Sequence, residues 1–100
     1  MKTYTICGSM RFENEMKHIA FMLETQYNMN IIQCIYSGGN TVSDSEKAGI
    51  AMAHYRKIDI SDGIYVVDID GYIGESVKKE IEYATNHHKE IIYHSKFINK

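Results

Sequence analysis

The segment from Gly71 to Ala84 places a carboxylate just beyond the point where a glycine-containing loop leads into a helix. Gly74 directly precedes the expected helix, and Ser76 falls in its first turn, where the helix dipole favours an anion or a hydroxyl. Ser76 and Glu80 are four residues apart and therefore share a face. Glu80 also borders an apolar stripe, which makes it a candidate for acid, base or nucleophilic chemistry. The alternative is a glutamate that pairs with a lysine on a solvated face.

A second candidate is the run Cys7-Gly8-Ser9-Met10-Arg11, which lies where a strand-like stretch feeds a helix. Gly8 permits a close approach to the backbone, and the free N–H groups of a helix start attract an anion. Ser9 adds a hydroxyl, and Arg11 adds a forked cation that suits phosphate. The alternative is a simple turn in which Ser9 caps the helix. The run is neither a dinucleotide fingerprint nor a Walker loop.

A third group consists of His54, Asp62 and Asp68. His54 lies on an expected helix and could titrate near neutrality, although a single helical histidine is more often a packing or surface residue. Asp62, followed by glycine, is expected to turn the chain into a strand. Asp68 ends that strand on the side where ligands bind.

The elements that must position these residues alternate between strand and helix. Apolar runs predict strands over residues 3–7, 31–36, 64–68 and 90–94. Helical spacing predicts helices over residues 11–27 and 75–86, and a further helix that Ser43 or Asp44 caps and that runs to residue 57. The residues after the last strand are expected to form a tail. This order predicts one α/β domain over residues 1–100, a three-layer Rossmann-like (flavodoxin-type) sandwich with a mainly parallel sheet of four or five strands. Ligands should bind beyond the strands, at the loops after residues 7, 36 and 68.

The composition narrows the choice of partners. The net charge of −2 argues against a surface that coats nucleic acid. No apolar run approaches the roughly 18 residues of a membrane span. Cys7 and Cys34 have neither zinc-finger spacing nor a disulfide framework. We therefore expect a cytoplasmic protein with a small-molecule ligand, no cofactor and no metal.

Taken together and in this order, three motifs resemble the nucleoside 2-deoxyribosyltransferase-like superfamily, which includes 2′-deoxynucleoside 5′-phosphate N-hydrolases. The motifs are Cys-Gly-Ser-x-Arg at 7–11, Ser-Asp-Gly-Ile-Tyr-Val-Val-Asp at 61–68, and Glu-Ile-x-Tyr-Ala at 80–84. The resemblance covers most of the chain. It implies an N-glycosidic bond hydrolase or transferase acting on 2′-deoxynucleosides or their 5′-monophosphates.

The resemblance also implies roles for individual residues. Glu80 would attack the anomeric carbon of the deoxyribose and form a covalent sugar ester, which water or a second base resolves. Ser9 and Arg11 would hold the 5′-phosphate, and Ser76 would correspond to the family's loop serine at a different spacing. The family completes its sites across subunits, so a homodimer or larger assembly is implied.

Several departures from the family pattern support an alternative. His54 stands where the hydrolases carry an aspartate, and Thr5 stands where the family often has a tyrosine. The loop between Asp68 and Glu80 is longer than in the hydrolases, and the sequence ends at Lys100, soon after the last expected strand. The alternative function is a catalytically inactive nucleotide-binding or sensing module of the same fold. A third possibility is a domain that serves only for assembly.

Overall fold

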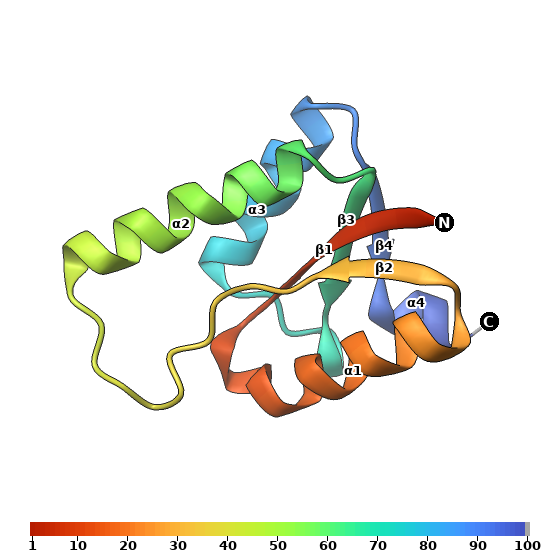
Figure 1. The fold of residues 1–100 in the computed structure, drawn as a ribbon, viewed down its shortest axis with the longest axis horizontal. Coiled ribbons are helices and arrows are strands. Elements are labelled where there is room, and N and C mark those ends of the chain that lie inside the picture. The colour runs from red at the N-terminus through yellow and green to blue at the C-terminus, as the bar shows by residue number, and fades with distance from the viewer. Residues whose placement is uncertain (100) are drawn as a thin grey trace.

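A four-stranded, fully parallel sheet forms the centre of the computed structural model, which describes residues 1–99 (Figure 1). The strand order is β2-β1-β3-β4. Their bounds are β1 Lys2–Gly8, β2 Met29–Ile32, β3 Gly63–Val67 and β4 Glu90–Tyr93. The predicted three-layer α/β architecture is therefore confirmed.

Helices cover both faces of the sheet because side chains alternate along each strand. Tyr65 and Val67 of β3 pack with α1 (Glu13–Gln26) and Phe97 of α4 (His94–Ile98). Ile64 and Val66 of the same strand point the other way. They pack against α2 and α3, whose bounds are Asp44–Asp59 and Glu75–Asn86. The two buried clusters are the two inner faces of one sandwich.

The chain order places a ligand crevice at the end of β1. From β1 the chain passes through α1 to β2 at one edge, then returns through α2 to β3 on the other side of β1. The strand order therefore reverses between β1 and β3, and in open α/β sheets ligands bind outside the carboxyl ends of the strands at such a reversal.

The second strand was predicted wrongly. It covers Met29–Ile32, whereas the sequence pattern indicated residues 31–36. β2 pairs with β1 only from Lys2 to Thr5, and the chain then leaves the sheet. An apolar run shows that a segment can be a strand, but the length of the strand is decided by its pairing partner.

The expected C-terminal tail is a short helix, α4. Asp68 fixes its first turn, because its carboxylate accepts hydrogen bonds from the Ser95 backbone N–H at 2.8 Å and from the Ser95 hydroxyl at 2.7 Å. Phe97 packs into the core beside Tyr65. A five-residue helix is too short to show a clear apolar periodicity in the sequence.

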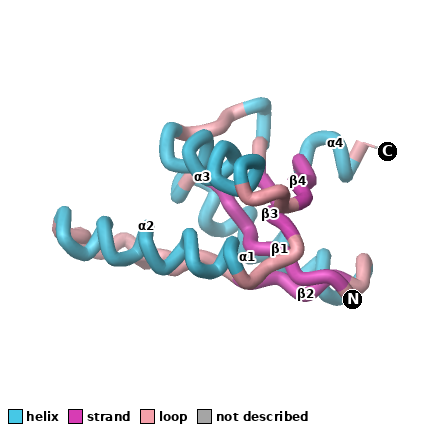
Figure 2. Tube along the Cα trace, turned by 90° about the horizontal axis from the view of Figure 1, so that it is seen from above, coloured by secondary structure: helices cyan, strands magenta, loops and turns pink. Residues whose placement is uncertain are grey.

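The first half of α2 projects beyond the sheet (Figure 2). A capping box starts the helix, because the Ser43 hydroxyl accepts from the Glu46 N–H while the Glu46 carboxylate accepts from the Ser43 N–H. Only His54 and Ile58, both near its end, are buried. This half-anchored helix and the loop before it extend the carboxyl edge of the sheet.

Candidate functional site

A cleft of about 760 Å³ opens beyond the carboxyl ends of the strands, where the sequence predicted a ligand site. Its volume lies within the range of small-molecule sites, about 300 to 1,000 Å³. It is bounded by the end of β1, the loop after β2, one face of α2 and the start of α3. The lining residues are Gly8, Ser9, Met10, Cys34, Ile35, Ser37, Asn40, Thr41, Val42, Lys47, Ile50, Ala51, His54, Tyr72, Gly74, Glu75, Ser76, Val77 and Glu80.

Three side chains from three elements meet at the base of this cleft. His54 Nε2 on α2 lies 3.3 Å from Cys7 Sγ on β1 and 3.4 Å from Glu80 Oε1 on α3. The Glu80 side chain is 16% exposed and the His54 side chain 7%. Burial raises the pKa of the Cys7 thiol well above its ordinary value, and the negative charge of Glu80 raises it further. Cys7 is therefore a neutral thiol in this arrangement.

The packing of α3 explains the position of Glu80. Val77 and Ala84 are buried against the sheet, and Ile81 is partly buried beside them, as the stripe predicted. Glu80 lies at the border of this stripe, so it lines the cleft and its side chain is neither fully buried nor fully solvated. Glu82 is exposed, as expected of a surface residue.

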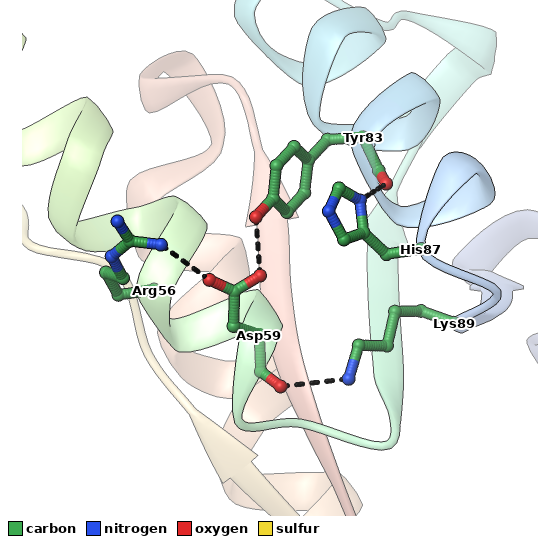
Figure 3. Close-up of polar contacts among 5 residues, drawn as sticks. All are labelled: Arg56, Asp59, Tyr83, His87 and Lys89. Carbon is green, nitrogen blue, oxygen red and sulfur yellow. Dashed lines mark hydrogen bonds and ion pairs between the residues drawn. The ribbon is translucent and has the colours of Figure 1, made fainter.

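A polar network around Asp59, the last residue of α2, connects this helix to α3 and to the residues that follow it (Figure 3). The Tyr83 hydroxyl donates to Asp59 Oδ1 at 2.5 Å, and Arg56 Nη1 donates to Asp59 Oδ2 at 3.0 Å. Lys89 Nζ donates to the Asp59 backbone oxygen at 2.9 Å, and the His87 ring stacks on Tyr83. These contacts hold together the two helices that carry His54 and Glu80.

This network predicts a stability that depends on pH. The hydrogen bond from Tyr83, and then the one from Arg56, lower the pKa of Asp59 below its ordinary value. A carboxyl whose pKa is lowered by folding stabilises the fold above its unfolded pKa, and this stabilisation disappears as pH falls through the folded pKa. Tyr83→Phe should therefore lower the thermal midpoint at neutral pH, and the difference from wild type should shrink below about pH 4.

Thermal unfolding followed by circular dichroism across this pH range measures the effect. Tyr93→Phe is the matched control, because no hydrogen bond involves the Tyr93 hydroxyl among residues 1–99. Its difference from wild type should not change with pH. A Tyr83→Phe difference that stayed constant from neutral to acid pH would contradict this role of Asp59.

Most of the predicted site residues meet in the cleft. Gly8, Ser9, Gly74 and Ser76 line it together with His54 and Glu80, and Cys7 lies beneath them in contact with His54. The Ser9 hydroxyl also caps the short turn Met10–Phe12, because it accepts from the Arg11 N–H at 3.3 Å. The turn alternative and the binding hypothesis for Ser9 are thus compatible.

Arg11, Asp62 and Asp68 lie outside the lining of the cleft. The Arg11 guanidinium stacks on the ring of Tyr72, with its central carbon 3.8 Å from the ring centre. Tyr72 lines the cleft, so Arg11 contacts a lining residue without lining the cleft itself. Asp62 precedes β3 at the opposite end of the sheet, where its carboxylate accepts from the Thr3 N–H. The carboxylate of Asp68 accepts hydrogen bonds from the backbone and the hydroxyl of Ser95.

Sequence reasoning did not single out the face of α2 that lines the cleft. Lys47, Ile50, Ala51 and His54 all line it, and they recur at helical spacing. That spacing was the available signal. The loop after residue 36 was expected to take part, and Ser37, Asn40, Thr41 and Val42 do line the cleft.

Comparisons with known proteins identify no relative of this chain. No protein-family model, curated protein or solved structure matches this chain. Within residues 1–99, the structure contains no helix with both the length and the apolar character needed to cross a membrane.

Proposed function

We propose that this chain is a member of the nucleoside 2-deoxyribosyltransferase-like superfamily that breaks the N-glycosidic bond of 2′-deoxynucleosides or their 5′-monophosphates, as a hydrolase or a transferase. The observation that carries the proposal is the position of Glu80. Its carboxylate lies on the wall of the cleft at the carboxyl edge of the sheet, largely shielded from water and 3.4 Å from an imidazole. A carboxylate held in this way suits a nucleophile.

The chemistry proceeds in two displacements at the anomeric carbon. A Glu80 oxygen forms a bond to C1′ while the bond from C1′ to the base nitrogen breaks, and the departing base takes the electron pair and a proton. Water or a second base then attacks C1′ and gives up its proton to the group that protonated the departing base, while the ester bond breaks to restore the carboxylate. His54, whose Nε2 lies 3.4 Å from Glu80 Oε1, orients the nucleophile and is the candidate donor of the proton.

The remaining lining fits a nucleotide in size and chemistry. Gly8 and Ser9 offer backbone and hydroxyl groups to a phosphate at the end of β1. Lys47 supplies a cation from α2, and Arg11 lies within reach if it leaves Tyr72. Ile35 and Ile50 supply apolar surface for the base and sugar.

We propose a homodimer or a larger homo-oligomer, in which a second copy completes the cleft. A reducing cytoplasm suits Cys7 and Cys34, which are both free thiols.

A nucleotide-binding or sensing module without turnover is the second candidate. The observation that favours it is the engagement of His54, whose Nε2 contacts both Cys7 and Glu80. Glu75, the other carboxylate in the lining, pairs with Lys78 at 3.1 Å. The described residues therefore offer few free acids to a departing base.

Incubation with a panel of deoxynucleosides and their 5′-monophosphates, followed by chromatography for free base, tests the proposal. Release of base supports the glycosidase and identifies its substrate. Thermal stabilisation by a monophosphate without release of base would contradict the glycosidase and support the binding module. The absence of both release and stabilisation refutes both functions.

A further inference from the structure

We propose that Cys7, His54 and Glu80 form a binding site for a zinc-like divalent transition-metal ion at the base of the cleft. Neither the sequence spacing nor the resemblance predicts such a site. The sequence shows no metal motif because the three ligands come from β1, α2 and α3, and only folding brings them together. The structure gathers a sulfur, a nitrogen and an oxygen donor within 4.8 Å of one another.

The spacing of these atoms fits tetrahedral coordination. Zinc bonds of about 2.0 to 2.3 Å at tetrahedral angles place neighbouring donors roughly 3.3 to 3.6 Å apart. His54 Nε2 lies 3.3 Å from Cys7 Sγ and 3.4 Å from Glu80 Oε1, so two edges of the tetrahedron are already formed. The third edge, from sulfur to carboxylate oxygen, is at most 4.8 Å, and the metal would require the Glu80 side chain to shorten it.

The donor set selects the class of metal. Thiolate and imidazole favour zinc and its neighbours over magnesium and calcium, which prefer oxygen ligands. On binding, the Cys7 thiol releases its proton to solvent, and the resulting thiolate and the Glu80 carboxylate together balance the two positive charges of the ion. No net charge is then left in a site where Cys7 and His54 are both buried.

The site has three protein ligands and one open side. Glu80 and His54 both line the cleft, so a water molecule or a ligand atom can take the fourth position from there. Three ligands with an open fourth position are typical of zinc sites that bind exchangeable ligands. If the proposed glycosidase function also holds, the metal would occupy Glu80 and inhibit base release.

Titration of the reduced 100-residue protein with Co²⁺, followed by absorption spectroscopy, tests the site without any activity assay. We expect one equivalent to produce a thiolate-to-cobalt charge-transfer band and the visible bands of a tetrahedral ion, and Zn²⁺ to displace it. Cys7→Ser should abolish the charge-transfer band. Glu80→Gln should keep the sulfur band and weaken binding by at least about 10-fold to 100-fold, since losing even an outer-shell partner costs that much.

Cys34→Ser is the matched control. Cys34 lines the same cleft but lies outside the three-donor cluster, so this variant should keep the band. A folded wild-type protein that gives no band overturns the proposal, as does a band that Cys34→Ser removes and Cys7→Ser keeps. If Cys7→Ser does not fold, the wild-type, Cys34→Ser and Glu80→Gln titrations decide. Base release is to be assayed separately in the presence of a metal chelator, so that failure of the glycosidase proposal and failure of the metal site are distinguished.

Discussion

Glu80→Gln is expected to lower the rate of base release by a factor on the order of ten thousand or more, as the removal of a catalytic nucleophile does in other enzymes that form covalent intermediates. An amide has nearly the same shape as the carboxylate, so the cleft and the contact with His54 should persist. It lacks the negative charge that, in the proposed mechanism, attacks C1′ and forms the ester. Single-turnover chromatography with saturating substrate measures the rate.

Glu82→Gln is the matched control for that experiment. Glu82 lies on the same helix and is exposed, and it is absent from the lining of the cleft. Its release rate should equal the wild-type rate. A Glu80→Gln variant that is folded by circular dichroism and still releases base at the wild-type rate would remove Glu80 from the mechanism.

Gly63→Ala is expected to reduce the free energy of unfolding by about 3 kcal/mol, the upper part of the range for overpacking. Gly63 pairs with Glu90 where β3 meets β4. A Cβ atom added at Gly63 would overlap the backbone carbonyl oxygen of Glu90, which cannot rotate away as a side chain can. The two strands would have to separate locally. Equilibrium denaturation in urea measures the loss.

Gly49→Ala provides the contrast, because it is the same substitution at an open position. Gly49 lies within α2, and an added Cβ there meets no atom within 4 Å. Alanine has a higher helix propensity than glycine by about 1 kcal/mol, so this variant should be as stable as wild type or more stable. If both variants lost the same free energy, close packing at Gly63 would not be the cause.

Local patterns predicted those parts of the fold that depend on nearby residues. The helix α3 spans Glu75–Asn86 as expected, because Gly74 precedes it and its apolar stripe faces one side. The strand β2 was predicted wrongly because its length depends on pairing with β1. The helix α4 was missed because it depends on Asp68, a residue distant in the sequence that fixes its first turn.

The candidate site likewise has parts that local patterns predicted and parts that depend on contacts between residues distant in the sequence. The rule that ligands bind at the carboxyl ends of parallel strands placed the cleft, and the Gly8-Ser9 and Gly74 loops do line it. No pattern could show that Cys7 and His54, 47 positions apart, touch each other. Asp62 seemed relevant through its motif, yet it precedes its strand and so lies at the opposite edge of the sheet.

Covalent trapping of the sugar tests the role of Glu80 most directly. The wild-type protein would be incubated with a 2′-fluoro-2′-deoxynucleoside, whose fluorine slows the second displacement, and then digested for peptide mass spectrometry. We expect the mass of one fluorinated sugar on the peptide that carries Glu80, with no such addition in Glu80→Gln. Base release without any adduct on Glu80, or an adduct on another residue, would contradict the proposed mechanism.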